Sequence, residues 1–161
     1  MESGGRADRC QGKQARHMKQ KSARAAPCPC GGAAFAACCA PYLSGAQLPA
    51  SAEALMRSRY TAYTLRDEAY LLATWHPGTR PVDGLFDDDQ GLTWLGLEVK
   101  SSLRLRLRKR KDDAECDGAD SDTVEFVARY KMAGRAHRLH EVSRFVREQG
   151  RWFYVDGSFP E

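Results

Sequence analysis

The sequence predicts an α+β fold in which helices precede a run of antiparallel strands. Two observations support this prediction. Apolar residues recur at near-helical spacing between residues 51 and 75, whereas from residue 92 onward they alternate with polar residues in the period of a strand. The expected strands follow one another with turn signals between them, so consecutive strands are expected to pair as an antiparallel meander.

The chain divides into three parts. Its 161 residues suffice for one main domain and a small appended module. Residues 1–25 hold seven basic and two acidic residues, and we expect a disordered basic tail there. Residues 26–45 are rich in Cys, Gly, Ala and Pro and have too few large side chains for a core of their own. Residues 48–161 have the pattern of a packed domain.

The N-terminal tail gives evidence on the cellular compartment of the protein. It has no apolar segment of the kind found in secretory signals, and nowhere does the chain approach the roughly 20 apolar residues of a membrane helix. We therefore expect a cytoplasmic protein with no membrane association. The Arg-rich tail leaves organellar targeting open, and Met18 is an alternative start.

Two helices are expected first. Ser51 is suited to cap a helix that runs to about Leu65. Asp67 is suited to cap a second, shorter helix that stops at His76, because Pro77 disfavours helical dihedrals in the residue before it.

Strand patterns follow. The expected strands cover residues 92–99, 102–110, 123–132, 138–148 and 151–157. Turns are expected at Ala133-Gly134 and Gln149-Gly150. Leucine and arginine alternate from Leu103 to Arg108, which predicts one covered and one solvated face. Because acidic residues follow this basic stretch at once, we predict no specific nucleic-acid binding through it.

Four cysteines dominate the segment before the helices. Cys28, Cys30, Cys38 and Cys39 form a CxC pair, seven intervening residues and a CC pair. Four thiolates are a complete tetrahedral set for zinc, and a closed set without an open position is structural. A metal also explains how a segment without a core folds, since site formation and chain ordering are then one event. We therefore predict a structural Zn²⁺ site.

Three other uses of the cysteines stay open. Two disulfides would require an oxidising compartment, and a bridge between the adjacent Cys38 and Cys39 would be strained. Inert buried thiols would need an interior, which residues 26–45 do not supply. Redox chemistry is the third alternative.

The order of the motifs resembles a known family. The segment CPCGGAAFAACCAPY is similar to the SEC-C motif, the zinc-binding tail module of the SecA translocation ATPase, although SEC-C modules usually have one more residue between the cysteine pairs. The segments LMRSRYTAY, YLLATWHP, FVARY, HEVSRFVRE and RWFYVDG resemble the YchJ-like family of small bacterial proteins. The resemblance implies a SEC-C zinc knuckle with the same four cysteine ligands. It also implies an NTF2-like (cystatin-like) domain, a cone of helices on a curved antiparallel sheet.

NTF2-like cones enclose a cavity that some relatives use for catalysis or binding, and fold alone does not decide between these uses. Neighbours on a strand point to opposite faces, so His140 and Glu141 are not expected to form a dyad. Glu141 would be a buried charge in need of a partner such as Arg57 or Arg59. We assign no catalytic residue. The pocket candidates are Tyr60, Tyr63, Trp75, His76, His140, Glu141 and Arg144.

The expected function is non-enzymatic. The zinc knuckle is expected to dock a protein partner or the ribosome, with Phe35 and Tyr42 presented to that partner. The alternative is a small-molecule enzyme or ligand-binding protein that uses the NTF2-like cavity. NTF2-like domains often pair through the outer sheet face, so a homodimer is also considered.

Overall fold

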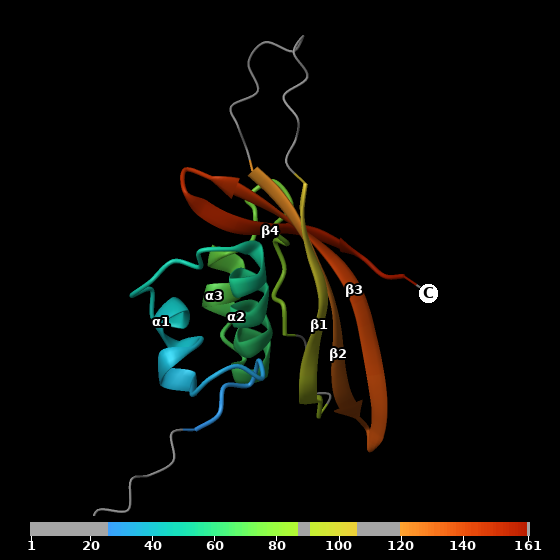
Figure 1. Cartoon of the computed structure of the whole chain (residues 1–161). Helices are drawn as coiled ribbons and strands as arrows, with labels where there is room; N and C mark the ends of the chain where they lie inside the picture. Colours follow the sequence, from blue (N-terminus) through green and yellow to red (C-terminus); the bar gives the residue numbers. More distant parts are fainter. Residues whose placement is uncertain (1–25, 87–90, 106–119, 161) are drawn as a thin grey trace, which may run out of the picture.

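The computed structural model describes residues 26–86, 91–105 and 120–160, so the expected basic tail lies outside the described residues (Figure 1). The order of elements confirms the α+β prediction. None of the helices in the described residues has the length and apolar character needed to cross a membrane. The elements are the 3-10 helix η1 (Phe35–Ala37), α1 (Ala40–Leu43), α2 (Ala52–Leu65), α3 (Glu68–Ala73), β1 (Thr93–Leu105), β2 (Asp120–Met132), β3 (Arg135–Glu148) and β4 (Arg151–Ser158).

The strands form one four-stranded sheet in the order β1-β2-β3-β4, and each neighbouring pair is antiparallel. The two turns lie where the sequence predicts them. Ala133 and Gly134 have φ of 48° and 80°, and Gln149 and Gly150 have φ of 47° and 79°. Two successive left-handed residues give a two-residue turn whose twist matches that of the flanking strands. The predicted meander is confirmed.

One strand prediction was wrong. Residues 92–99 and 102–110 were expected as two strands, but β1 runs without a break across Lys100 and Ser101. Its pairing with β2 shifts register between Val99 and Ser101. An extra residue of this kind interrupts the two-residue period and bends the strand, which is why one strand reads as two in the sequence. The leucine–arginine alternation lies outside the residues whose side chains the structure describes.

Helix α2 has the predicted bounds. The backbone N–H of Ala54 donates to the Ser51 hydroxyl oxygen at 3.1 Å, which is the expected N-cap. The helix ends at Leu65, and its C-cap residue, Arg66, has a left-handed φ of 57°. The following helix is capped by Asp67 as predicted, because its carboxylate accepts from the Tyr70 N–H at 3.0 Å.

Helix α3 ends earlier than expected, at Ala73 rather than at His76. The next residues join the sheet instead. Trp75 forms a parallel bridge with Tyr154, and the His76 N–H donates to the Tyr154 carbonyl at 2.7 Å. Pairing with β4 therefore ends the helix before Pro77 acts on it.

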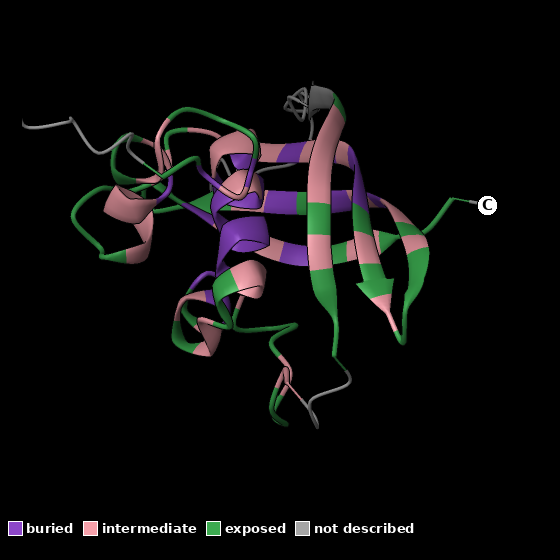
Figure 2. Cartoon of the chain, turned by 90° about the horizontal axis from the view of Figure 1, so that it is seen from below, coloured by how far each residue is buried: buried purple, intermediate pink, exposed green. Residues whose placement is uncertain are grey.

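Helix α2 is the centre of the molecule. In Figure 1 it lies between the curved sheet and the N-terminal segment that contains η1 and α1. The buried residues gather on α2 and on the stretches of the strands that lie next to it (Figure 2). Leu55, Val124 and Phe145 are 0% exposed and belong to this core. The helix is thus covered on two sides, which positions both candidate sites described below.

Candidate functional site

The four cysteines come together beside α2. Their Sγ atoms all lie within 4.8 Å of one another, and Cys30 is 3.4 Å from Cys28, 3.5 Å from Cys38 and 3.7 Å from Cys39. Ligands about 2.3 Å from a tetrahedral zinc are about 3.8 Å apart, so these distances fit a four-thiolate site. They are far longer than a disulfide bond of about 2.05 Å, and all four cysteines are free.

A tight hairpin brings the first pair of cysteines into position. Pro27 and Ala34 form an antiparallel bridge, and the Gly31 N–H donates to the Cys28 carbonyl at 3.0 Å. Gly32 lies directly under the sulfurs. A Cβ atom there would lie 2.8 Å from the Cys38 Sγ, so only glycine fits without displacing a ligand. The seven-residue spacing is thus sufficient to gather all four thiols.

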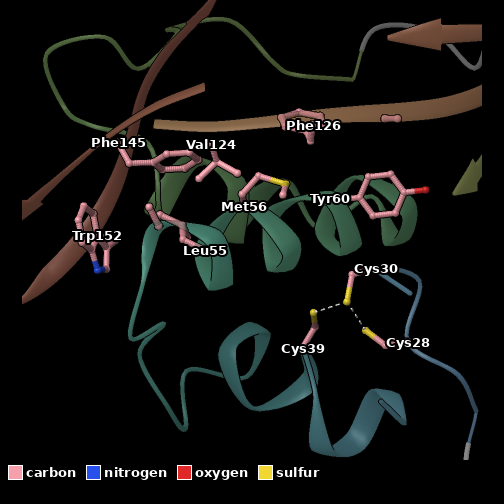
Figure 3. Packing of buried hydrophobic residues seen from close by; sticks show 12 residues of the cluster. Cys28, Cys30, Cys39, Leu55, Met56, Tyr60, Val124, Phe126, Phe145 and Trp152 are labelled. Carbon is pink, nitrogen blue, oxygen red and sulfur yellow. Dashed lines mark hydrogen bonds between the residues drawn. The ribbon is translucent and has the colours of Figure 1, made fainter. Parts of the chain in front are cut away.

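The cysteines are buried against the main domain. Cys28, Cys30 and Cys39 are at most 4% exposed and share one cluster with Leu55 and Met56. Figure 3 shows α2 between these sulfurs and the apolar side chains of the sheet. The expectation that residues 26–45 have no interior for thiols was wrong, because α2 supplies it.

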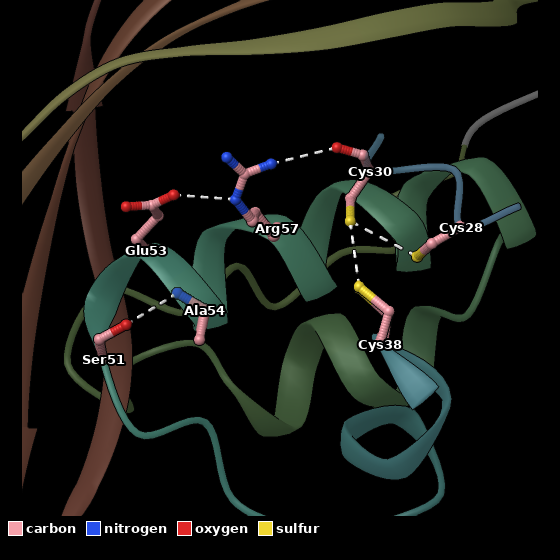
Figure 4. Close-up of polar contacts among 8 residues, drawn as sticks. Cys28, Cys30, Cys38, Ser51, Glu53, Ala54 and Arg57 are labelled. Atoms are coloured by element: carbon pink, nitrogen blue, oxygen red, sulfur yellow. Dashed lines mark hydrogen bonds and ion pairs between the residues drawn. The ribbon is translucent and has the colours of Figure 1, made fainter. Parts of the chain in front are cut away.

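Polar side chains of α2 also hold this segment. The Nη1 of Arg57 donates to the Cys30 carbonyl at 3.2 Å, and its Nε donates to Glu53 at 2.9 Å (Figure 4). One turn further on, the Thr61 hydroxyl lies 3.8 Å from the Cys28 Sγ. The helix therefore orients two of the four ligands.

Without a metal the four thiols do not all ionise at neutral pH. Burial, together with the neighbouring Cys30, raises the pKa of Cys38 to about 11. Burial also raises the pKa of Cys39. Burial opposes ionisation of Cys28 as well, but hydrogen bonds from the Cys30 backbone and from neighbouring thiols lower its pKa to about 7. A divalent cation would displace the remaining protons and hold four thiolates.

A second candidate site is a half-open cavity of about 400 Å³ between α2 and the concave face of the sheet. Four of the predicted pocket residues line it: Tyr60, Tyr63, Trp75 and Glu141.

The other three pocket candidates do not line the cavity, and their prediction is corrected. The His76 Nε2 lies 3.1 Å from a Glu148 oxygen. The His140 Nε2 lies 2.8 Å from Glu125, on the sheet face opposite Glu141. The Nε of Arg144, a residue on that same outer face, donates to Asp156 at 3.0 Å. Their residue types suit catalysis, but strand parity and the early end of α3 place them elsewhere.

Glu141 has partners other than the predicted arginines. Its Oε1 accepts from the Ser143 hydroxyl at 2.7 Å and from the Tyr154 hydroxyl at 3.1 Å. In the described part of the chain neither Arg57 nor Arg59 forms an ion pair with it. The expectation of a direct Glu–Arg pair was therefore wrong in its contact, although Arg59 lines the same cavity.

Sequence reasoning missed Gly157. This residue pairs with Ser143 across the β3–β4 ladder, and the Glu141 carboxyl group packs against it. A Cβ atom at Gly157 would lie 2.8 Å from the Glu141 carboxyl carbon. The only signal was a glycine inside a strand, which indicates close approach of another group but not which one.

A hollow of about 330 Å³ lies beside the cysteine segment. Tyr42 of α1, Tyr70 of α3 and Trp152 of β4 line it, together with Leu48, which is 55% exposed. We call it the knuckle groove. Phe35, expected on a presented surface, is half-buried and packs on the core cluster instead.

A curved antiparallel sheet around a central helix, with a four-cysteine hairpin on the far side of that helix, defines an NTF2-like domain that carries a SEC-C type module. The family model described as "YchJ, middle NTF2-like domain" matches residues 51–157. The chain belongs to the YchJ-like family.

Relatives extend the match to most of the chain. The chain is 51% identical to a UPF0225 protein of Chromobacterium violaceum, over 87% of this chain and 98% of the relative. It is 54% identical to a UPF0225 protein of Methylibium petroleiphilum, over 81% and 87% respectively.

Two solved structures have the same fold. The solution structure of a SEC-C motif containing protein from Rhodopseudomonas palustris superposes with a TM-score of 0.64 at 34% identity, over 83% of this chain and 98% of that chain. The crystal structure of a SEC-C motif containing protein from Psychrobacter arcticus gives 0.60 at 25% identity, over 87% and 85%.

Proposed function

We propose that the protein is a cytoplasmic, non-enzymatic docking module in which a structural Zn²⁺ ion holds the SEC-C hairpin on the NTF2-like domain. The four cysteines would be its ligands. One observation carries the proposal: Tyr42 and Leu43, directly after the cysteines, form one wall of the knuckle groove, and α3 contributes the other. The groove therefore depends on the position of the cysteine segment, and a metal that orders this segment shapes the groove.

The donor set supports zinc in a structural role. Soft thiolates favour Zn²⁺ over the hard cations Mg²⁺ and Ca²⁺. Four protein ligands leave no coordination position for a substrate, which separates this centre from catalytic zinc sites.

The lining of the knuckle groove supports a protein partner. Its charged residues are one acid and one base, Asp67 and Arg151, and the rest are apolar or uncharged. Binding to nucleic acid requires a surplus of basic side chains, which this surface does not provide. An apolar side chain of a partner protein is the better match for Tyr42 and the exposed Leu48.

The test compares partner enrichment for four forms of the full chain by quantitative cross-linking and mass spectrometry in cells. We expect a set of proteins enriched with the wild type to be lost with Leu48→Asp and with a variant carrying serine at all four cysteines. The matched control is Leu65→Asp, since Leu65 is 52% exposed but does not line the groove. That variant should retain the set.

Two results would contradict the docking proposal. One is an unchanged partner set in the four-serine variant or in Leu48→Asp. The other is the absence of metal, by elemental analysis of reduced protein purified without chelator, while residues 26–45 remain ordered. Cosedimentation with intact ribosomal subunits that Leu48→Asp abolishes would identify the ribosome as the partner.

A further inference from the structure

The cavity between α2 and the sheet has the size and access of a ligand site. Its volume of about 400 Å³ falls within the range of about 300–1,000 Å³ that is usual for small-molecule pockets. Phe159 lines the cavity and is 64% exposed, so the cavity reaches the surface beside the C-terminal end of β4. A ligand could enter there without unfolding the sheet.

Two opposite charges face this cavity. Arg59 is 5% exposed, and its Nη1 donates both to the Leu71 carbonyl at 2.7 Å and to the Thr74 hydroxyl at 2.8 Å. A guanidinium has five N–H groups, so these two bonds and a further contact with the Tyr63 hydroxyl leave N–H groups for a ligand. Glu141 accepts its two hydroxyl hydrogen bonds at Oε1, and the described residues donate none to Oε2. The cavity therefore offers a donor and an acceptor.

Both charged groups are held in place before any ligand arrives. The Arg59 guanidinium lies 5.0 Å from the centre of the Trp75 ring and 4.6 Å from that of Tyr154. Two hydroxyl hydrogen bonds orient the Glu141 carboxylate. The carboxylate packs against Gly157, where a larger residue would displace it. A site whose polar groups are already oriented loses little entropy when it binds.

Aromatic rings form much of the remaining wall. Tyr60 and Trp94 meet edge to face at 5.4 Å, and Trp94 lies 6.2 Å from the ring of Tyr63. Rings of this kind stack on flat apolar molecules. The indole Nε1 of Trp75 is buried and has no hydrogen-bond partner among the described residues. A small shift of this ring toward an acceptor would satisfy it.

We propose that this cavity binds a small, uncharged, planar molecule that carries an acceptor and a donor side by side, of which a cyclic amide is the simplest example. The carbonyl oxygen accepts from Arg59, the amide N–H donates to the Glu141 carboxylate, and the ring stacks on the aromatic wall. This role is separate from docking at the knuckle groove and does not depend on it.

Charge decides between this ligand class and its rivals. An anionic ligand would gain from Arg59 but would be repelled by Glu141 in the same cavity, and a cationic ligand would be attracted by Glu141 but repelled by Arg59. A purely apolar ligand would cover the remaining N–H groups of Arg59 and the Oε2 of Glu141 without giving them partners, which is costly. An uncharged donor–acceptor pair satisfies both residues.

The experiment titrates the zinc-loaded full chain with three bicyclic probes, followed by calorimetry and by the fluorescence of the cavity tryptophans. The probes are 2-quinolinone, 2-naphthoate and naphthylmethylammonium, which differ mainly in the charge of the polar group. We expect 2-quinolinone to bind at least about tenfold more tightly than either charged probe.

A charge-removing variant makes the test sharper. Glu141→Gln keeps the size of the side chain and leaves Arg59 unopposed, so 2-naphthoate should gain about tenfold in affinity and 2-quinolinone should lose affinity. The matched control is Glu98→Gln, because Glu98 pairs with Arg129 on the exposed surface and does not line the cavity. That variant should leave all three affinities unchanged. Phe159→Ala, at the cavity mouth, should weaken all three probes alike.

Three results would overturn the proposal. The first is that no probe saturates the wild type. The second is that 2-naphthoate binds the wild type most tightly. The third is that Glu141→Gln, with a melting temperature showing that it is folded, behaves like the Glu98 variant. If Glu141→Gln does not fold, unchanged binding of 2-quinolinone to Phe159→Ala would overturn the proposal instead.

Discussion

Two glycines stand at positions where a methyl group would displace a functional side chain. Gly32 lies against the Cys38 and Cys30 sulfurs, at 2.8 and 3.3 Å from where its Cβ would be. Gly157 lies under the Glu141 carboxyl group. The added methyl group would have to displace a cysteine sulfur in one case and the Glu141 carboxyl group in the other. A glycine-to-alanine substitution therefore tests each site while leaving its functional side chains in the sequence.

We predict that Gly32→Ala lowers the affinity for zinc by about 10-fold or more, the size of effect seen when the surroundings of a metal ligand are altered. The measurement is competition with a chromophoric chelator. Gly96→Ala is the control, since a Cβ atom at Gly96 meets nothing within 4 Å and its φ is not in the left-handed region. Equal zinc affinities for the two variants would show that the sulfurs tolerate the methyl group.

The cysteine pKa values predict the proton balance of metal binding. In the metal-free chain the pKa of Cys38 is raised to about 11 and that of Cys39 is also raised, so both carry protons at neutral pH. Zinc requires thiolates, so its binding should release about two protons or more, and its affinity should fall as the pH falls. Calorimetry in buffers of different ionisation enthalpy measures this number. Binding without proton release would contradict a four-thiolate site.

The clustering of the four cysteines could be predicted from the sequence, but the residues that line the cavity could be predicted only in part. Candidate metal ligands can be identified from residue type and close spacing, as in the CxC and CC pairs. Cavity residues depend on which strand face looks inward and on register. The inward orientation of Glu141 can be predicted because it lies an even number of residues from the apolar Phe145. The contact between Gly157 and Glu141 depends on a register shift in β4 opposite Arg144 and Phe145. No local pattern encodes that shift.

Among the elements, α2 has contacts on both sides, and Arg57 is its main polar link to the cysteine segment. We predict that Arg57→Ala increases hydrogen exchange of residues 28–39 and lowers the local stability by about 1 kcal/mol, because it removes the hydrogen bond to the Cys30 carbonyl. Exchange within β2 and β3 should not change.

Glu53→Gln is the matched control for this prediction. It removes the charge that pairs with Arg57 but leaves the bond from Arg57 to Cys30. If hydrogen exchange in the cysteine segment rises as much in Glu53→Gln as in Arg57→Ala, the Arg57–Glu53 ion pair stabilises this segment rather than the hydrogen bond from Arg57 to Cys30.

Elements with local signals were predicted well, and those shaped by distant contacts were not. The caps at Ser51 and Asp67 and the turn at Ala133-Gly134 depend on a few neighbouring residues, and all three are confirmed. The end of α3 depends on a bridge to Tyr154, some eighty residues later, and was placed too late. The irregularity at Lys100 bends β1 and was mistaken for its end.

At the scale of the whole molecule, the four-cysteine cluster and the main core form one unit. Three of the cysteines belong to the same buried cluster as Leu55 and Phe145. We therefore predict that chelation lowers the melting temperature of the entire chain by about 10 °C or more, in a single transition seen by both near-UV and far-UV circular dichroism. Two separate transitions, or an unchanged main transition, would show that the cysteine segment folds independently.

The oligomeric state stays a prediction. The sheet face opposite α2 carries ion pairs such as those of Arg129 with Glu98 and His140 with Glu125. A homodimer through this face would bury charged groups and should dissociate as salt is raised. Native mass spectrometry and sedimentation at two salt concentrations measure it. A monomer at low salt would contradict the dimer.

The position of α2 has a thermodynamic consequence. Arg57 and Thr61 contact the cysteine segment, while Tyr60 and Met56 line the cavity. The same helix therefore contributes to the proposed zinc site and to the proposed ligand site. If removal of the proposed zinc ion shifts α2 and changes the affinity for 2-quinolinone by some factor, linkage requires 2-quinolinone to change the affinity for the ion by the same factor. Binding of the probe in the cavity would then change how tightly the four cysteines hold the proposed zinc ion by that same factor.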